Sequence, residues 1–421
     1  MYKEIKQCRI CGNSNLVSVI HLGNQFLTGV FPKNKEEIVT CGPLELVKCF
    51  DSKGENTCGL LQLRQSYDLK EMYGKNYGYR SGLNKSMVEH LHQKVRNILQ
   101  KISLNAGDIV LDIGSNDSTL LQAYPSDRDI EIIGMDPTGE KFKEYYPGHI
   151  RLVADFFSSS NFKKIFDKRK AKIITSISMF YDIEDPLGFM NQVTDILDDK
   201  GVWVFEQSYM PIMLQENAYD TICHEHLEYY GLKQIKWLTD RAGLKILDIE
   251  INKINGGSFS VMAAHKNHPL PESPKVGVIL AQEENAQLHT LKPYLDFKDN
   301  IVRHRVELSE KLKQIREQGS KVFGYGASTK GNVILQWCGF TVNDIACIAE
   351  VNRDKFGSFT PGSFIPIIPE QEARAKKPDY FLVLPWHFRD NIIVREKEYL
   401  KSGGKLFFPL PKLEIVSQRE A

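Results

Sequence analysis

The chain has 421 residues, of which 42% are hydrophobic and 25% charged, the composition of a globular protein of two or three domains. Its formal net charge of +1 gives no general attraction to nucleic acid or to an anionic membrane, and no run of about 18 apolar residues could span a bilayer. The first six residues lack the apolar segment of a signal peptide, so we expect a cytoplasmic protein without a nucleic-acid or membrane partner.

The first predicted unit, residues 1–75, is rich in cysteine and contains short strand-like runs. In a reducing compartment, clustered cysteines favour metal ligation over disulfides. A CxxC pair followed by two further cysteines can close a tetrahedral structural zinc site. Cys41 could replace a member of the second pair, and free buried thiols are the alternative. The four predicted ligands are Cys8, Cys11, Cys49 and Cys58.

The second predicted unit, residues 76–265, alternates helical and strand-like segments. Apolar residues at helical spacing predict a helix over 84–101. Four strand-like runs separated by helical stretches are typical of a parallel, doubly wound sheet. These runs are 109–113, 130–135, 173–177 and 201–206.

Acidic residues follow these strands, as a site for S-adenosylmethionine (SAM) requires, because SAM carries an amino group and a sulfonium but no phosphate. Gly114 lets the backbone approach a ligand closely, and Asp112 stands at the end of the first strand. Asp136, at the end of the second, can accept both ribose hydroxyls. Asp155 and Phe156 fit the adenine edge and ring. The GxGxxG fingerprint of NAD-binding proteins is absent, and the alternative is that these acids only cap helices.

A second group of polar residues, Cys223-His224-Glu225-His226, follows the strand 201–206. Histidine can remove a proton near neutral pH, and tyrosine or histidine can donate hydrogen bonds to an enolate. The pattern is not HExxH, which excludes the metalloprotease interpretation. The earlier segment 73–82 interleaves tyrosine and glycine, and we expect a flexible lid there in preference to a packed stripe.

The third predicted unit, residues 266–421, begins with an exposed linker over 265–275 and repeats the α/β pattern. A charged helix over about 290–318 precedes strands at 321–325, 344–349, 380–384 and 404–408. The predicted fold class is therefore α/β, with two Rossmann-like doubly wound domains and a small N-terminal zinc-binding module. We take a monomer as the default state.

Together these motifs resemble the deoxysugar C-methyltransferases, which methylate C3 of nucleotide-linked 4-keto sugars. The resemblance runs over nearly the whole chain and implies a zinc module, a SAM-binding domain and a second Rossmann-like domain that helps to hold the nucleotide sugar. The residues that match the SAM motif of the family are Asp112, Gly114, Asn116 and Asp117. The C-terminal signatures include 254–258, 325–332, 361–362, 365–367, 384–386 and 408–411.

The resemblance also implies residue roles. His226 would remove the C3 proton, the enolate would attack the SAM methyl group, and Glu225 and His224 would position base and substrate. Tyr77 and Tyr79 would line the sugar site, with Cys223 close to the keto oxygen. Lys330 and the amides after Gly326 lie where a helix begins, which suits a diphosphate. The candidate substrate-binding residues are Tyr325, Ser328, Lys330 and Asn332.

The chain departs from the family pattern at three places. Cys223 replaces the usual tyrosine, Ser118 replaces a glycine of the SAM turn, and Tyr181-Asp182 stands where Ala-His is common. A thiol is a weaker and shorter donor than a phenol, so the sugar or the methylated atom can differ. An O-methyltransferase on a nucleotide-linked sugar is the alternative. A binding protein without catalysis is disfavoured by the intact His-Glu-His, and a nucleic-acid methyltransferase by the near-zero charge.

Overall fold

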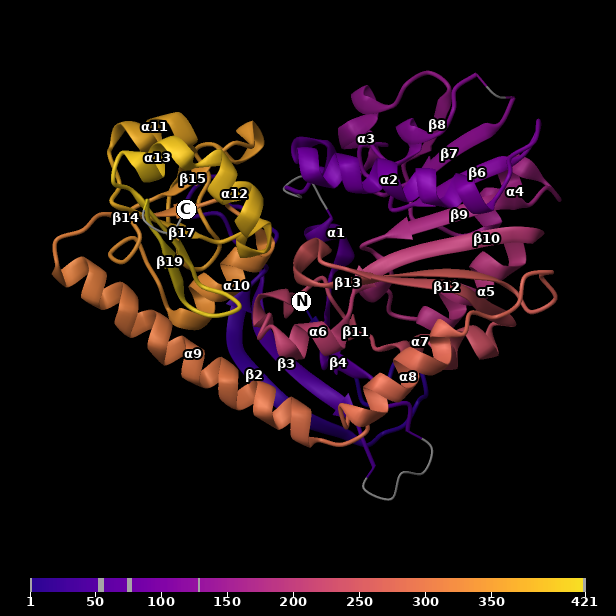
Figure 1. The fold of residues 1–421 in the computed structure, drawn as a ribbon, viewed down its shortest axis with the longest axis horizontal. Coiled ribbons are helices and arrows are strands. Elements are labelled where there is room, and N and C mark those ends of the chain that lie inside the picture. Colours follow the sequence, from indigo (N-terminus) through magenta and orange to yellow (C-terminus); the bar gives the residue numbers. More distant parts are fainter. Residues whose placement is uncertain (1, 52–56, 74–77, 128, 419–421) are drawn as a thin grey trace.

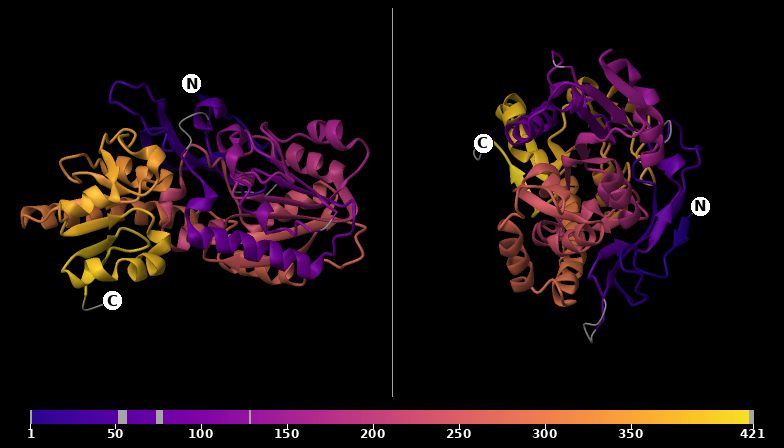
Figure 2. Two further views of the ribbon diagram at one scale, coloured as in Figure 1. Left: turned by 90° about the horizontal axis from the view of Figure 1, so that it is seen from above. Right: turned by 90° about the vertical axis from the view of Figure 1, so that its right-hand side faces the viewer.

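The computed structural model describes residues 2–51, 57–73, 78–127 and 129–418. Two α/β units lie side by side, and an antiparallel sheet from the N-terminal part of the chain runs below and between them (Figure 1). The same two lobes are separate in the view from above (Figure 2). The predicted fold class is confirmed by this arrangement of two doubly wound sheets and an N-terminal cysteine module.

The larger unit is built on a seven-stranded sheet in the order β12-β13-β10-β9-β6-β7-β8. The five strands from β10 to β8 are parallel, and β13 and β12 add an antiparallel edge. Because parallel strands end at the same edge, the residues that follow β6, β7 and β9 come together there. The strands are β6 (Ile109–Ile113), β7 (Glu131–Met135), β8 (Ile150–Val153), β9 (Ala171–Ile177), β10 (Leu197–Ser208), β12 (Leu244–Asn252) and β13 (Ser258–His265).

Helices cover both faces of this sheet, and α2 (Lys85–Lys101) shows why they form. The Asn84 side chain caps the helix by accepting a hydrogen bond from the Ser86 amide. Apolar residues at positions 87, 91, 95 and 98 then form its buried stripe. The other helices of this unit are α1 (Leu69–Met72), α3 (Gly139–Phe142), α4 (Ser159–Phe166), α5 (Pro186–Ile196), α6 (Met210–Gln215) and α7 (Leu232–Arg241). The 3₁₀ turns are η1 (Ser81–Leu83), η2 (Leu121–Ala123), η3 (Lys143–Tyr145), η4 (Phe180–Asp182), η5 (Tyr219–Thr221) and η6 (Ile254–Gly256).

The smaller unit contains a six-stranded sheet in the order β16-β15-β14-β17-β18-β19, parallel except for β19. The prediction of a strand from residue 344 was wrong, because the Asp344 carboxylate accepts hydrogen bonds from Thr341 and fixes a turn. The strands are β14 (Val322–Tyr325), β15 (Ile348–Glu350), β16 (Ile367–Pro369), β17 (Tyr380–Val383), β18 (Lys405–Phe408) and β19 (Glu414–Val416). The helices and turns are α10 (Thr329–Cys338), α11 (Glu370–Ala375), α12 (Arg389–Arg395), α13 (Lys397–Lys401), η7 (Arg353–Lys355) and η8 (Trp386–Phe388).

The N-terminal module contributes the antiparallel sheet β11-β4-β3-β2 and the pair β1-β5. The edge strand β11 (Glu228–Tyr229) is added to this sheet by the larger unit, begins two residues after His226 and pairs with β4, so the module is joined to the candidate catalytic segment. The long strand β2 also contacts α9 and α10 of the smaller unit. The strands are β1 (Tyr2–Glu4), β2 (Leu16–Phe26), β3 (Cys41–Cys49), β4 (Leu61–Leu63) and β5 (Gln65–Tyr67).

Two helices connect the α/β units. The first, α8 (Lys275–Asn285), packs against α7 and β12 of the larger unit, and α9 (Lys292–Glu317) crosses to the smaller one (Figure 1). The division of the chain at 265/266 stays a prediction, and the contacts of α8 favour a boundary at about 286–291. Across the described residues, no helix is both long and apolar enough to cross a membrane.

Candidate functional site

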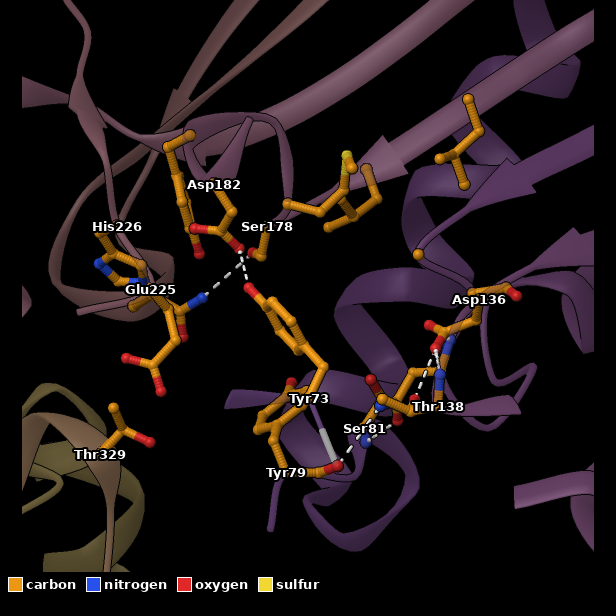
Figure 3. Close-up of a pocket in the computed structure, with 18 of the residues that line it drawn as sticks. Tyr73, Tyr79, Ser81, Asp136, Thr138, Ser178, Asp182, Glu225, His226 and Thr329 are labelled. Atoms are coloured by element: carbon orange, nitrogen blue, oxygen red, sulfur yellow. Dashed lines mark hydrogen bonds between the residues drawn. The ribbon is translucent and has the colours of Figure 1, made fainter. Parts of the chain in front are cut away.

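A cavity of about 620 Å³ lies between the two α/β units and is lined by residues of both. The larger unit contributes the ends of β6, β7 and β9 together with residues 225, 226 and 255, and the smaller unit contributes 327–330, 355 and 385–388. Figure 3 shows two groups of side chains in it. Asp136, Thr138 and Ser81 lie at one end, and Asp182, Glu225 and His226 lie at the other.

A tight turn after β6 forms the first end of the cavity. Gly114 has φ +74°, and a Cβ there would come within 3.1 Å of Met179 Cγ. Asn116 and Ser118 also adopt positive φ, at 48° and 63°. Ser118 therefore holds a left-handed conformation that costs a serine more than a glycine. Its hydroxyl donates a hydrogen bond to the Tyr145 carbonyl over 2.8 Å. A glycine at this position would lack that hydrogen bond.

Two buried carboxylates stand beside this turn. Asp136 accepts the Asn116 amide at 2.8 Å through one oxygen and the Thr138 amide at 2.6 Å through the other. Asp112 accepts the Thr175 hydroxyl at 2.6 Å. Burial raises the pKa of Asp112 to about 7, against this hydrogen bond, and the charge of Asp136 adds to the rise. Both carboxylates line the cavity, and their contact with SAM stays a prediction.

The other predicted cofactor residues differ in position. Phe156 is half-exposed and lines the cavity, as does Asn116, whereas Asp155 is exposed and accepts a hydrogen bond from the Asn161 side chain at 3.2 Å. Asp117 is buried outside the lining and accepts the Gly82 amide at 2.9 Å. It therefore ties Gly82, at the end of the tyrosine-rich segment, to the turn after β6.

The described part of that segment, residues 78–82, borders the cavity. Tyr79 lines it and is 47% exposed, and its carbonyl accepts the Asn116 side chain at 3.3 Å. The Ser81 amide donates to Asn116 Oδ1 at 3.0 Å. Tyr77 lies outside the described residues, so its predicted role in the sugar site stays a prediction.

His226 lines the second end of the cavity. Its Nδ1 lies 2.8 Å from the Thr221 carbonyl, which can only accept, so Nδ1 carries the proton and Nε2 keeps a lone pair. Burial, and then the charge of Lys330, lowers the pKa of His226 to about 3. The ring is therefore neutral at neutral pH and able to accept a proton. Tyr181 packs edge-on against it, with ring centroids 4.3 Å apart.

Of the three residues that precede His226, one lines the cavity and two are buried away from it. Glu225 lines the cavity, whereas His224 and Cys223 are fully buried and do not. His224 donates from Nε2 to the Gln25 carbonyl over 3.2 Å, and burial lowers its pKa to about 3. It therefore anchors the candidate catalytic segment to β2. Cys223 packs in the core next to the smaller unit, where burial raises the pKa of its thiol.

Sequence reasoning missed several polar lining residues. Asp182, from the turn η4, accepts the Tyr73 hydroxyl at 2.9 Å. His387 and Asn255 also line this end, and Asn255 Nδ2 lies 3.5 Å from the Ser178 hydroxyl. Asp182 was noted as a departure from the family, but its position beside Glu225 depends on the packing of η4 against β11. No local pattern gives that contact.

The predicted substrate residues follow β14. Ser328 caps α10 by accepting the Gly331 amide at 3.0 Å, and it lines the cavity together with Thr329 and Lys330. The buried Lys330 ammonium donates to the Asn255 carbonyl at 2.7 Å. Lys355, which the sequence did not single out, donates to the Ala327 carbonyl at 2.7 Å and also lines the cavity.

Two predicted substrate residues lie outside the cavity lining. Asn332 is fully buried and donates to the Thr28 carbonyl at 2.7 Å. The Tyr325 hydroxyl donates to Glu396 at 2.9 Å and accepts from Arg395 at 2.7 Å. Tyr325 therefore belongs to a buried polar cluster at the far face of its sheet, and burial raises the pKa of its phenol.

The four predicted metal ligands converge. All four sulfur atoms lie within 4.8 Å of one another, and the Cys8–Cys58 and Cys11–Cys49 sulfurs are 3.5 Å apart. A tetrahedral ZnS₄ site with bonds of about 2.3 Å has sulfur–sulfur edges of about 3.8 Å, so the cluster fits zinc and leaves no position for a substrate. Cys41 is exposed at the start of β3 and is no part of the cluster.

Comparison with known proteins gives matches in all three parts of the chain. The family “Putative zinc binding domain” matches residues 8–73, “Methyltransferase domain” matches 87–249, and “C-methyltransferase C-terminal domain” matches 253–411. The chain is 28% identical to C-methyltransferase NovU of Streptomyces niveus over 418 residues, which are 99% of this chain and 98% of that protein.

Two solved structures show weaker similarity. A SAM-dependent methyltransferase from Clostridium acetobutylicum is 14% identical, with 42% of this chain and 92% of that chain covered and a TM-score of 0.32. The YcgJ protein from Bacillus subtilis is 15% identical, with 38% and 73% covered and a TM-score of 0.31. The match to NovU thus runs from end to end, whereas each structure covers less than half of this chain.

Proposed function

Because the chain belongs to the family of SAM-dependent C-methyltransferases, we propose that it methylates C3 of a nucleotide-linked 4-keto-6-deoxy sugar. The observation that carries this proposal is a cavity that joins the acidic turn of one unit to the N-terminus of α10 in the other and is also lined by a neutral histidine, His226. We also propose that the protein is a monomer, which sedimentation analysis tests.

His226 is the proposed base at C3. The Thr221 carbonyl fixes its tautomer, and Nε2 is left to take the proton from the carbon next to the ketone. A pKa near 3 makes a weak base, but the charge of Lys330 contributes to that low value. An anionic substrate beside Lys330 offsets this charge and raises the basicity of His226 in the complex.

The acidic end would hold SAM. Asp136 lies where it can accept the ribose hydroxyls, Asp112 faces the side of the turn where a cationic group fits, and Phe156 offers a ring surface for adenine. When bound there, SAM supplies an electrophilic methyl group. The chain itself orients the two ligands and keeps water from the reacting carbon through the Tyr79 segment.

Lys330 is proposed to act at the reacting end. It lines the same cavity as His226, its ammonium donates to the Asn255 carbonyl, and its charge lowers the pKa of both His226 and His387. A cation there stabilises the negative charge that develops on the keto oxygen as C3 loses its proton. Cys223, outside the lining, is not available as the donor that the family's tyrosine would be.

The diphosphate end is proposed to consist of the α10 N-terminus, Ser328, Thr329 and Lys355. Backbone amides at a helix N-terminus and a lysine ammonium together bind phosphate oxygens well. Among the residues that the structure describes, Lys355 makes no ion pair within 4.0 Å, and its partners are the Ala327 carbonyl and the Phe31 ring. Its charge is therefore left for an anion. We propose no direct ligand contact for Tyr325, Asn332, Asp117 or His224.

The test uses nucleotide-linked 4-keto-6-deoxy sugars that carry deuterium at C3, incubated with SAM and the protein. We expect a product that gains one CH₂ unit and loses the deuterium, and a loss of at least about 100-fold in rate for His226→Asn with unchanged SAM binding. His265→Asn is the matched control, since His265 contacts the Leu197 carbonyl away from the cavity. A methylated product that retains the deuterium would overturn C3 methylation and favour the O-methyltransferase alternative.

A further inference from the structure

A buried carboxyl group, Asp220, joins the two α/β units next to the segment that carries His226. It belongs to η5, a turn of the larger unit that packs against α10 of the smaller one. Its side chain is fully buried, and Oδ2 accepts a hydrogen bond from Trp386 Nε1 at 2.7 Å. Trp386 belongs to η8 of the smaller unit. Asp220 therefore makes a direct side-chain contact between the units, and the proposed function gives it no role so far.

On one side, Asp220 is connected to the proposed base. The next residue in η5 is Thr221, whose carbonyl accepts the hydrogen bond from His226 Nδ1 at 2.8 Å. That hydrogen bond selects the tautomer in which Nε2 can take a proton. Because Asp220 and Thr221 share one turn, an anchor on the Asp220 side chain also limits how far the Thr221 carbonyl can move.

On the other side, Asp220 is connected to the proposed cation through Trp386. The ring of Trp386 packs against η6, where a Cβ at Gly256 would lie 3.2 Å from Trp386 Cη2. The carbonyl of the preceding residue, Asn255, accepts the Lys330 ammonium at 2.7 Å. Lys330 also lies on α10, the helix against which η5 packs. Packing and hydrogen bonds thus connect Asp220 with Lys330 by two routes.

The electrostatics of Asp220 favour a nearby cation. Its Oδ1 is buried and has no hydrogen-bond partner among the described residues. Burial raises the pKa of Asp220, and the charge of Lys330 opposes that rise. The effect is mutual, because burial lowers the pKa of Lys330 and the charge of Asp220 opposes that fall. Other titratable groups that interact with one or the other are Tyr219, Cys223, His226, His304 and His387.

We infer that Asp220 is a positioning residue, which holds the Thr221 carbonyl that orients His226 and supplies the negative charge that balances the buried Lys330 ammonium. This inference rests on the proposed function, in which His226 removes the proton and Lys330 stabilises the enolate. Asp220 is not among the residues that line the cavity, so it acts through these two side chains. A neutral lysine could still donate a hydrogen bond to an oxyanion, but a charged one stabilises it more.

The variant Asp220→Asn removes the charge and keeps an oxygen that can accept the Trp386 hydrogen bond. Methyl transfer is measured as kcat and KM between about pH 6 and pH 10. We expect kcat to fall at least about 10-fold with SAM affinity unchanged, and the alkaline decrease of kcat/KM to begin about one pH unit lower. The direction follows because loss of the carboxylate lowers the pKa of Lys330. A variant that is only less stable would lose activity without this shift.

The charge state of Lys330 is also measured without any methyl transfer. Only a neutral amine reacts with acetic anhydride, so the pH dependence of Lys330 acetylation, followed by mass spectrometry, reports its titration. We expect this titration to lie about one pH unit lower in Asp220→Asn than in the original protein. Glu396→Gln is the matched control, because Glu396 is a buried carboxyl group that accepts the Tyr325 hydroxyl outside the cavity lining. It should change neither the Lys330 titration nor the pH profile.

The variant Trp386→Phe separates the two parts of the role. It keeps an aromatic ring beside η6 and removes the N–H that Asp220 accepts, so the charge of Asp220 remains. We expect the Lys330 titration to stay where it is in the original protein, while kcat falls because the Thr221 carbonyl is less firmly held. Thermal melting shows whether each variant is folded.

The outcomes separate the inference from the proposed function. An unchanged Lys330 titration in folded Asp220→Asn overturns the inference, whatever the activity. A shifted titration with an unchanged kcat and pH profile also overturns it, because Asp220 then affects Lys330 but not the reaction. If no keto sugar is methylated at C3 although the Lys330 titration depends on Asp220, the proposed function fails and the pairing of Asp220 with Lys330 is supported.

Discussion

The two α/β units offer opposite chemistry to the same cavity. After β6 the chain makes a tight turn and the short 3₁₀ helix η2, and the charged side chains that line the cavity beside this turn are Asp112, in β6, and Asp136, after β7. After β14 the chain enters the ten-residue helix α10, and the charged side chains that line the cavity are Lys330 and Lys355. One unit therefore presents negative charge, and the other presents a helix N-terminus with positive charge.

The difference fits the proposal that the two units hold ligands of opposite charge. An aligned helix places partial positive charge at its N-terminus, which suits a phosphate and opposes a sulfonium. In the larger unit, Asn116 and Ser118 have positive φ values, so no helix begins directly after β6 and no helix N-terminus points at the cavity there. The smaller unit keeps the helix and caps it with Ser328. The predictions below test whether a substitution at one end of the cavity changes the affinity for one ligand and leaves the affinity for the other unchanged.

The largest effect is expected for the variant Cys58→Ser, because the N-terminal module contacts the elements that form both ends of the cavity. The N-terminal sheet pairs with β11 next to His226 and contacts α10 through β2. The buried Lys48 also joins this module to the α8–α9 connection, by donating to the Leu288 carbonyl at 3.1 Å. We expect loss of zinc and a decrease of at least about 4 kcal/mol in the free energy of unfolding.

Metal analysis and thermal melting check this expectation, and affinities for SAM and nucleotide sugar should fall together. Cys41→Ser is the control, because Cys41 is exposed and outside the cluster, and it should retain one zinc ion and the original melting temperature. A zinc-free Cys58→Ser protein of full stability would show that the cluster does not support the cavity.

A smaller effect, confined to one end, is expected for Asp136→Asn. The charge-assisted hydrogen bonds that Asp136 can offer to ribose are worth about 1.5–3 kcal/mol, so SAM affinity should fall roughly 10- to 100-fold. Affinity for nucleoside diphosphates should not change. Calorimetry measures both, with Asp155→Asn as the control at an exposed carboxylate outside the lining. Equal loss at both ends would contradict the separation of the two ligands.

The converse variant is Lys355→Met, which keeps an unbranched aliphatic side chain close to Gly78 and removes the ammonium group. We expect about a 10-fold loss of affinity for nucleoside diphosphates and for inorganic pyrophosphate, with SAM affinity unchanged. Added salt should weaken diphosphate binding in the original protein more than in this variant. Lys313→Met, on the exposed face of α9, is the control. An unchanged diphosphate affinity would remove Lys355 from the proposed site.

The sequence predicted the features that depend on spacing along the chain. The CxxC pair and two later cysteines gave the metal cluster, and the strand–turn pattern placed Asp112 and Asp136 at neighbouring strand ends. Parallel strands end at one edge of a sheet, so consecutive strand ends are brought together by the fold class itself.

Features that depend on side-chain direction or on contacts between units were not predictable in this way. Tyr325 belongs to the same signature as Ser328, but strand β14 directs its side chain toward Glu396 and away from the cavity. Asp182 reaches Glu225 only because η4 packs on β11. Lys355 reaches the α10 N-terminus from a turn after β15. In each case the decisive contact joins elements that no periodicity connects.

The smallest predicted effect is a pH dependence at the acidic end alone. Burial raises the pKa of Asp112 to about 7, above the ordinary value of about 3.9. The stability that this protonated carboxyl contributes is fully present below about pH 4 and is lost as pH rises toward 7. SAM, a cation, prefers the ionised form, so its dissociation constant should fall roughly threefold to tenfold between pH 6 and pH 8. Calorimetry across this pH range measures the SAM affinity. The variant Asp112→Asn should bind SAM with an affinity that does not change with pH, and diphosphate binding should not change between the two proteins. If SAM affinity still depends on pH in Asp112→Asn, another group titrates in this range. Asp136 would then be the charged residue that contacts SAM at the acidic end of the cavity.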